Sequence, residues 1–188
     1  MRSLAGSLAA IPPAAQASAS LSPSSRTTFR GRLGREMETS DRQAIQDRNH
    51  AAADRLRALG SRLSDAELTR SIDPPWTAAG LFAHVAFWDR FVYARWLLAA
   101  STGSRTPIDR DDAFLELIND ASLRQWAVIP PRAAVEDCLE ATAQIDALIE
   151  SLDDDAVEVV HRRRPRLVDR SLHRGEHLAT IETAFPSA

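Results

Sequence analysis

Two histidines near the C-terminus have a spacing that suits a metal ion. In the stretch RSLHRGEHLATIE, residues 170–182, His173 and His177 stand four positions apart. If the stretch is helical, residues at i and i+4 lie one turn apart on the same face. That face continues as Ile181 and Phe185, which are apolar. The pattern therefore predicts that both imidazoles point into the protein from a last helix.

A third histidine lies on the apolar face of an earlier helical stretch. His84 is flanked within one turn by Leu81 and Trp88, so we expect it to point toward the same interior. Helical bundles build metal sites from side chains on facing helices. Three neutral imidazoles suit zinc, nickel, iron or copper, and three protein ligands leave a coordination position open for water or substrate. An open position is typical of a catalytic site.

The alternative is that these histidines only pack. A single histidine on an apolar face is more often a hydrogen-bonded core residue than a ligand, and pairs spaced like His173 and His177 also occur on solvated faces. The joint inward placement of all three histidines favours a metal site. Of the other two histidines, His50 lies off the apolar seam of its helix and is expected at the surface. His161 lies in a basic segment and fits either interpretation.

The apolar periodicity predicts four long helices and one short helix. The long ones cover residues 40–63, 77–100, 130–152 and 169–185, and the short one covers residues 111–128. The first helix carries a narrow apolar seam formed by Ile45, Asn49, Ala52, Leu56, Leu59 and Leu63. Thr77 and Asp169 are expected N-caps. The fold class is therefore all-α, a four-helix bundle with one extra short helix between the second and third helices.

Two connections complete this arrangement. Residues 64–76 are expected to link the first two long helices and to stop at Pro74 and Pro75. Residues 153–168 are expected to form a long connection that is acidic first and basic afterwards, with the segment VEVV briefly extended. Long connections of this kind permit crossovers between helices that are not antiparallel neighbours.

Residues 1–38 differ from the rest of the chain. They are rich in Ala, Ser, Pro and Arg, and they contain no acidic residue before Glu36. We expect a disordered N-terminal extension here, followed by one helical domain over residues 39–188. Three origins of the extension stay open, namely a start codon assigned too far upstream with Met37 as the true start, a flexible tail, or an organellar transit peptide.

Bulk composition excludes several functional classes. The net charge of −3 and the pI of about 6.0 give no general attraction to nucleic acid or anionic lipid. No apolar run approaches the roughly 20 residues of a membrane span, so we expect a cytoplasmic protein. The single cysteine, Cys138, excludes an internal disulfide framework, and its place on an apolar stripe predicts an inert core thiol. The expected partner is a small molecule.

Two stretches carry a family resemblance. PPWTAAGLFAHVAFWDRFVYARW, followed much later by LHRGEHLATIE, resembles the DinB/YfiT-like superfamily, and the similarity covers roughly residues 40–185. The resemblance implies a four-helix bundle of up-down-down-up arrangement. It also implies a metal triad of one histidine on the second helix and a His-x-x-x-His pair on the fourth. These positions correspond to His84, His173 and His177.

The resemblance leaves the reaction open, because fold does not settle function. Related proteins include low-molecular-weight-thiol S-transferases, a mycothiol-dependent maleylpyruvate isomerase and hydrolase-like detoxification proteins. It implies a divalent transition metal (Zn, Ni or Fe) and a thiol such as mycothiol, bacillithiol or glutathione, activated for S-transfer, isomerisation or hydrolysis of a small electrophile. The alternative is a non-catalytic, metal-stabilised bundle that dimerises or sequesters a small molecule. A homodimer is compatible with the wide apolar face of the second helix.

Further polar residues are candidates for supporting roles. Glu176 and Asp89 are candidate catalytic groups that orient ligand imidazoles or move protons, although both also suit a solvated helix face. The basic segment is a candidate binding site for the carboxylates of a thiol cofactor or an acidic substrate. Its members are Arg162, Arg163, Arg164 and Arg166. The same segment also suits a solvated loop that offsets the acidic residues 153–155.

Overall fold

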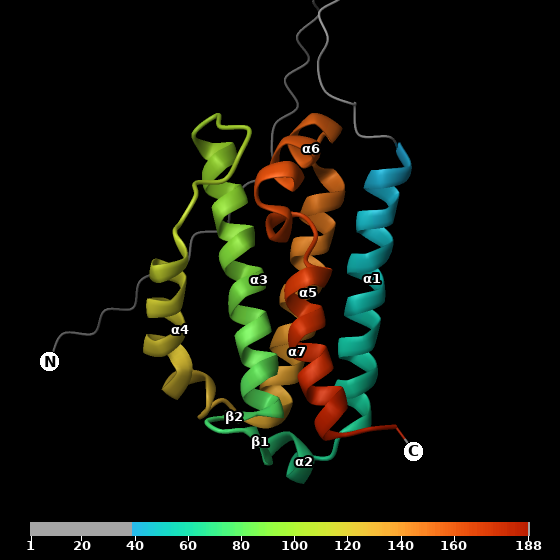
Figure 1. The fold of residues 1–188 in the computed structure, drawn as a ribbon, viewed down its shortest axis with the longest axis vertical. Helices are drawn as coiled ribbons and strands as arrows, with labels where there is room; N and C mark the ends of the chain where they lie inside the picture. The colour runs from blue at the N-terminus through green and yellow to red at the C-terminus, as the bar shows by residue number, and fades with distance from the viewer. Residues whose placement is uncertain (1–38, 188) are drawn as a thin grey trace, which may run out of the picture. The chain divides into compact units, whose positions relative to one another are not determined.

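The computed structural model describes residues 39–187, and four long helices run along its length (Figure 1). These are α1 (Thr39–Arg62), α3 (Ala78–Ser101), α5 (Pro131–Ser151) and α7 (Ser171–Ala184). In Figure 1, α1 and α7 run downward while α3 and α5 run upward. Viewed upside down, this is an up-down-down-up arrangement. Helices α3 and α5 are parallel and pack closely against each other. The all-α bundle predicted from the sequence is confirmed.

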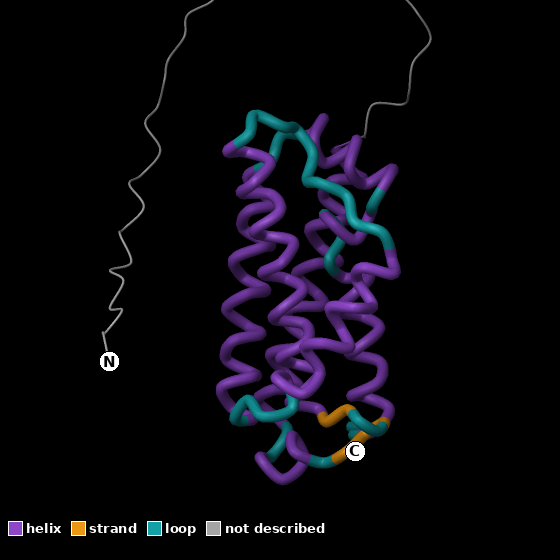
Figure 2. The backbone as a smooth tube through the Cα atoms, turned by 90° about the vertical axis from the view of Figure 1, so that its left-hand side faces the viewer, coloured by secondary structure: helices purple, strands orange, loops and turns teal. Residues whose placement is uncertain are grey.

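Further elements connect these four helices, most of them at the ends of the bundle, as the tube in Figure 2 shows. They are α2 (Asp65–Thr69), β1 (Ser71–Asp73), β2 (Trp76–Thr77), α4 (Asp112–Trp126), α6 (Asp154–Arg163) and the single-turn 3₁₀ helix η1 (Pro165–Leu167). β1 and β2 pair antiparallel, with Ser71 opposite Thr77. Helix α4 is the predicted extra helix, and it carries the chain from the top of α3 back to the bottom of α5 (Figure 1).

The prediction of an extended segment at VEVV is wrong. Residues 154–163 form α6, because the side chain of Asp153 caps the helix by accepting a hydrogen bond from the backbone N–H of Ala156. Val157 and Val160 then lie buried on one face of the helix. The apolar residues that resembled a short strand instead follow the spacing of a single buried helix face.

The two predicted helix caps have different outcomes. Thr77 caps α3 as expected, with its hydroxyl accepting from the N–H of Gly80 at 3.0 Å. The prediction that Asp169 caps α7 is wrong, because the first N–H of that helix, from Ser171, donates at 3.0 Å to Asn49 Oδ1 on α1. Asp169 accepts instead from Arg48 and from the Ser171 hydroxyl. A side chain far away in sequence therefore satisfies the start of α7.

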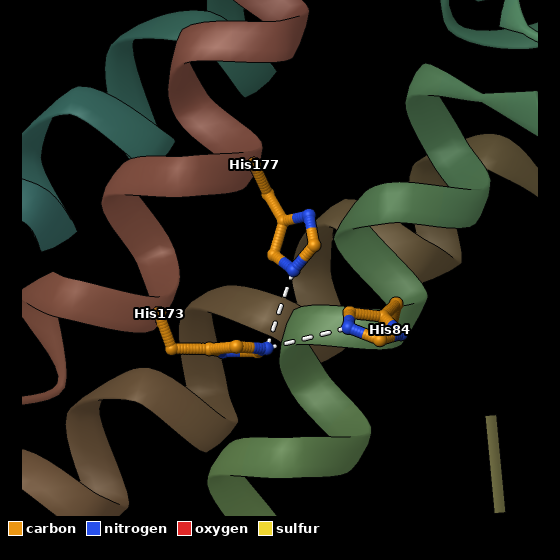
Figure 3. A group of neighbouring side chains, drawn as sticks. All are labelled: His84, His173 and His177. Atoms are coloured by element: carbon orange, nitrogen blue, oxygen red, sulfur yellow. Dashed lines mark hydrogen bonds between the residues drawn. The ribbon is translucent and has the colours of Figure 1, made fainter. Parts of the chain in front are cut away.

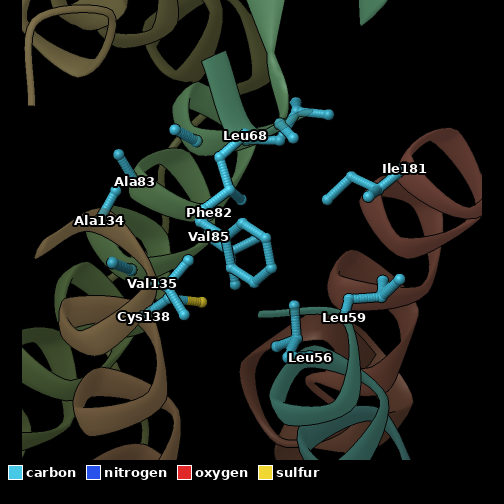
Figure 4. Close-up of a cluster of buried hydrophobic side chains, with 14 of the residues drawn as sticks. Leu56, Leu59, Leu68, Phe82, Ala83, Val85, Ala134, Val135, Cys138 and Ile181 are labelled. Atoms are coloured by element: carbon cyan, nitrogen blue, oxygen red, sulfur yellow. The ribbon is translucent and has the colours of Figure 1, made fainter. Parts of the chain in front are cut away.

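Apolar side chains from all four long helices fill the interior. Leu56, Phe82, Val85, Cys138 and Ile181 meet in one cluster near the lower half of the bundle (Figure 4). Every residue of the seam predicted for the first helix is buried. A fully buried Leu or Phe stabilises the folded state by about 1.5–3 kcal/mol, so this cluster fixes how α3 and α7 face each other.

Two further sequence predictions concern the N-terminal extension and the absence of a membrane span. The extension predicted for residues 1–38 lies outside the described residues. Within residues 39–187, no helix is both long enough and apolar enough to cross a membrane.

Candidate metal centre

Three imidazoles converge in the interior of the bundle (Figure 3). Nε2 of His173 lies 3.3 Å from Nε2 of His84 and 3.2 Å from Nε2 of His177. One ring nitrogen from each residue lies within 4.8 Å of the other two. We call this group the histidine centre. Helix α3 contributes one member and α7 contributes two, which share a face because they are four residues apart.

Aromatic rings surround the member that comes from α3. The ring centroid of His84 lies 4.7 Å from that of Trp126 and 5.3 Å from that of Trp76, both in edge-on contacts. Trp88 approaches from the next turn of α3, at 6.2 Å. His84 Nδ1 is buried and has no hydrogen-bond partner among residues 39–187. A buried polar atom without a partner is costly, so packing alone does not explain why a histidine occupies this position.

Burial keeps the three imidazoles neutral. Burial, followed by the neighbouring His177 and Arg170, lowers the pKa of His84 to about 3. Burial, followed by Arg166 and Arg170, lowers the pKa of His177 to about 4. The pKa of His173 is also held well below its ordinary value, again chiefly by burial. Neutral imidazole is the form that binds a metal ion, so near neutral pH the centre has the protonation state of a ligand set.

A second polar cluster lies directly behind the histidine centre. Arg174 is fully buried, and it contacts Asp89 and Asp146 at 2.9 Å each. Arg170 donates from Nε to Asp89 Oδ1 at 2.8 Å. Burial by itself would raise the pKa of Asp89, but Arg174 and Arg170 together hold it below its ordinary value. We call these four residues the Arg–Asp network, and its two cations and two anions balance.

One contact links the network to the histidine centre. Arg170 Nη2 lies 3.3 Å from His173 Nδ1. A guanidinium can only donate, so Nδ1 accepts and the proton of neutral His173 lies on Nε2. A cation bound at Nε2 requires the other tautomer, with the proton on Nδ1, and Arg170 must then give up this contact. The three imidazoles otherwise fit a metal ion in number, neutrality and convergence.

The histidine centre lies at the wall of a cavity of about 810 Å³. Residues of α3, α4, α7 and the η1 segment line this cavity, and all three histidines are among them. The centre is therefore not enclosed by protein on every side. A bound ion would retain a position that a small molecule in the cavity could reach, which is the open arrangement of catalytic sites.

The model of the DinB superfamily matches residues 48–182. This chain belongs to the DinB superfamily. No curated protein and no solved structure matches it at a significant level. The match confirms the resemblance drawn from the two motif stretches, both of which end within or at the edge of the matched region. Membership of the DinB superfamily gives the fold, the three-histidine cluster is a feature of this structure, and neither names a reaction.

The structure places the other predicted site residues in different surroundings. Glu176 lines the cavity and forms an ion pair with Arg166. Asp89 lies outside the cavity lining and touches no histidine, so any effect it has on the centre passes through Arg170. Of the predicted basic residues, Arg163, Arg164 and Arg166 line the cavity. Arg162 faces elsewhere and pairs with Glu158 one turn before it.

The remaining histidines and the cysteine lie away from the centre. His50 is exposed and contacts Glu150 at 2.6 Å. His161 is half-buried on α6. Cys138 is buried in the apolar cluster, and burial raises the pKa of its thiol to about 12. A thiol with so high a pKa is not a nucleophile near neutral pH.

Sequence reasoning missed Arg170 and Arg174, although a signal was present. The two arginines precede His173 and His177 by three residues each, so the same helix arithmetic places them on the inward side of α7. Two buried arginines require carboxylate partners, and Asp89 on α3 was available within the apolar face. Asn49 was assigned to the apolar seam, but its capping of α7 could not be read from local pattern.

Proposed function

We propose that this DinB-superfamily protein is a divalent-metal-dependent enzyme that activates a low-molecular-weight thiol or water toward a small electrophile. One observation carries the proposal: three neutral imidazoles converge at the wall of an open cavity. His84, His173 and His177 would hold the ion, and zinc, nickel and iron all suit an all-imidazole set. A bound divalent ion supplies Lewis acidity, which lowers the pKa of a thiol or water beside it.

The protein groups around the centre have separate tasks in this proposal. The rings of Trp76 and Trp126 keep water away from His84, which lowers the local dielectric and strengthens electrostatic effects. Glu176 is the carboxylate of α7 that lines the cavity beside the histidines. We propose that it accepts the proton of the thiol or water. Asp89 acts as a positioning residue, because it fixes the guanidinium that touches His173.

The basic segment near η1 is assigned to ligand binding. Arg163, Arg164 and Arg166 line the same cavity as the histidines, and guanidinium groups bind carboxylates in a planar, two-pronged geometry. They suit a thiol that carries carboxylates, such as mycothiol, bacillithiol or glutathione. In S-transfer the thiol proton passes to Glu176, sulfur forms a bond to the electrophilic carbon, and the leaving group departs with the electron pair. Isomerisation and hydrolysis use the same activated nucleophile.

Metal content is the first test. Untagged full-length protein should contain about one equivalent of a transition metal by elemental analysis. A His84→Ala, His173→Ala double variant should contain none. His50→Ala is the matched control, because this exposed histidine lies outside the centre, and it should retain the metal. A metal-free parent that takes up no zinc, nickel or iron would contradict the proposal.

Turnover separates the enzyme from a non-catalytic module. Metal-loaded protein should accelerate thiol addition to an electrophile such as 1-chloro-2,4-dinitrobenzene, and Glu176→Gln should reduce kcat by roughly 100-fold, the usual range for general acid–base groups. Stoichiometric metal without turnover across a panel of thiols and electrophiles would instead favour a metal-stabilised bundle that dimerises or sequesters a small molecule. Sedimentation of the same sample would show whether a homodimer forms.

A further inference from the structure

The cavity at the histidine centre continues along one face of α3. His84, Trp88, Val92 and Arg95 all line it. Successive members are four, four and three residues apart, so they form one stripe on the helix. At a rise of 1.5 Å per residue, the 11 positions from His84 to Arg95 span about 16 Å. The cavity therefore has a length as well as a volume, with the imidazoles at one end and a guanidinium at the other.

Arg95 is a largely buried cation that forms no ion pair with another described residue, although the carboxylate of Asp109 lies near enough to act on its charge. Arg95 is only 8% exposed, yet it forms no ion pair with a carboxylate of residues 39–187. Nε and Nη2 both donate to the backbone carbonyl of Ile108, which leaves Nη1 without a hydrogen bond in the described part of the chain. Arg170 and Arg174 are similarly buried, but each contacts Asp89. Arg95 therefore keeps hydrogen-bonding capacity toward the cavity that it lines, whereas the other two arginines use theirs on carboxylates.

Further cations line the same end of the cavity, although Arg110 and Arg163 are exposed and water screens their charge. Neither forms an ion pair with another described residue. Arg164 is balanced by Asp109 at 3.0 Å. The cavity-lining carboxylates of α4 belong to exposed residues, where water screens their charge. The buried charge at this end is therefore the cation of Arg95.

The section between the two ends is mostly apolar. Trp88 and Val92 form the α3 side, and Leu115 from α4 and Leu167 from η1 also line it, beside polar residues of α4. Trp88 is held in place by its indole N–H, which donates to Asn119 Oδ1 at 3.0 Å. Such a wall favours a ligand with an apolar middle, because apolar surface removed from water stabilises binding by about 25 cal/mol per Å².

We propose that this cavity binds an elongated ligand whose anionic end pairs with Arg95 and whose opposite end reaches the histidine centre, about 16 Å further along the axis of α3. The chemical class is a carboxylate at the end of an extended, largely apolar chain. The identity of the far end as a reacting thiol rests on the proposed function. The anion site at Arg95 does not, because it requires no metal.

A homologous series of thiols tests both the charge and the length. The probes are 11-mercaptoundecanoate, the short 3-mercaptopropionate, and the uncharged 11-mercaptoundecanol, used below micelle-forming concentrations. Binding to zinc-loaded full-length protein can be followed by intrinsic tryptophan fluorescence, to which Trp76 and Trp88 of the cavity lining contribute. The long acid should bind roughly tenfold more tightly than either the short acid or the alcohol, since a charge-assisted pair contributes about that factor.

Variants at one position assign the effect to Arg95. Arg95→Met should weaken binding of the long acid roughly tenfold and change binding of the alcohol less than about twofold. Arg95→Lys keeps the charge and should retain most of the preference. Arg57→Met removes one arginine from an exposed pair with Asp54 on α1 and should change neither ligand. Circular dichroism and the melting temperature show whether each variant is folded, and the wild-type comparison of acid with alcohol stands even if Arg95→Met unfolds.

The outcomes separate this proposal from the proposed function. Equal affinity of the wild type for the long acid and its alcohol would overturn the anion site. So would a preference for the acid that survives in folded Arg95→Met. If undecanoate, which has no thiol, binds metal-free protein in an Arg95-dependent way and no metal is ever taken up, the anion site stands and the proposed function fails. If the protein turns over thiols without any preference for their charge or length, the proposed function stands and the anion site fails.

Discussion

Two polar clusters lie next to each other in this bundle, and they differ in how their members are paired. The histidine centre and the Arg–Asp network both draw on α3 and α7. In the network every charged group faces the opposite charge, as when Arg174 contacts both Asp89 and Asp146. In the histidine centre three neutral rings face one another, and His84 Nδ1 has no partner among the described residues.

The difference separates a structural cluster from a functional one. The network is complementary and closed, so its members contribute to the fold even though desolvation offsets much of their attraction. The histidine centre is not complementary within the described chain, and it borders a cavity. Buried polar groups that lack partners reduce stability, so they are expected where function requires them. Experiments on the two clusters should therefore give opposite results.

The largest expected effect comes from removing one charge of the network. Arg174→Met should lower the free energy of unfolding by about 3–5 kcal/mol, because it leaves Asp89 and Asp146 with an uncompensated buried charge. Urea denaturation followed by circular dichroism measures this loss. Arg57→Met, which removes an exposed arginine, should cost less than about 0.5 kcal/mol. A loss at Arg174 below about 1 kcal/mol would contradict a structural role for the network.

Replacing a histidine of the centre should not lower the free energy of unfolding of metal-free protein, in contrast to replacing Arg174. His84→Leu removes a buried atom without a partner, which is worth about 1–3 kcal/mol, so the variant should be as stable as the parent or more stable. Zinc at 100 times its dissociation constant should stabilise the parent by about 2.7 kcal/mol and leave His84→Leu unchanged. His50→Leu should respond to zinc like the parent. Marked destabilisation of metal-free His84→Leu would indicate that the histidine is a packing residue.

Acid should act on the histidine centre before it acts on Asp89 of the network. The folded pKa values of His84 and His177, about 3 and about 4, lie below the ordinary 6.5. Between those values and 6.5 the unfolded chain binds more protons than the folded one, so stability falls as pH falls through this window. Each histidine contributes at most about 1.4 kcal/mol per pH unit.

Urea unfolding of metal-free protein between pH 7 and pH 4 measures this slope. His84→Leu should make the slope shallower by the contribution of one proton. Asp89 stays ionised throughout, because Arg174 and Arg170 hold its pKa below its ordinary value despite burial. Burial raises the pKa of Asp146, so that carboxyl contributes with the opposite sign, equally in the parent and in His84→Leu. An unchanged slope in His84→Leu would mean that His84 is charged in the folded protein.

The smallest expected loss of stability comes from replacing Asn49 of α1, which caps the start of α7. Asn49→Ala removes the acceptor for the first N–H of α7 and should cost about 1 kcal/mol. It should also weaken zinc binding several-fold, because the first turn of α7 carries His173. Asp111→Ala removes the cap of α4, which bears no histidine, so it should lose similar stability without changing zinc affinity. Equal zinc affinity in both variants would show that Asn49 only stabilises the fold.

Much of the fold and part of the site could be predicted from sequence, because they depend on local periodicity. The apolar seam from Ile45 to Leu63 marks one buried face of α1. The spacing of His173 and His177 fixes their common face, and the apolar neighbours of His84 direct it inward. The extended segment predicted within residues 157–160 was wrong because a short apolar run suits a strand and one face of a helix equally well.

Local periodicity indicates most of the residues that face the core, whereas the contacts between those residues depend on how the helices pack. Capping of Ser171 by Asn49 joins positions 122 residues apart. The balance of Arg170 and Arg174 by Asp89, and the lack of any carboxylate on Arg95, depend on the register in which α3 and α7 pack. Periodicity along one helix carries no information about that register. The contacts of the clusters arise from packing between helices, and the cavity that joins His84 to Arg95 arises from it too.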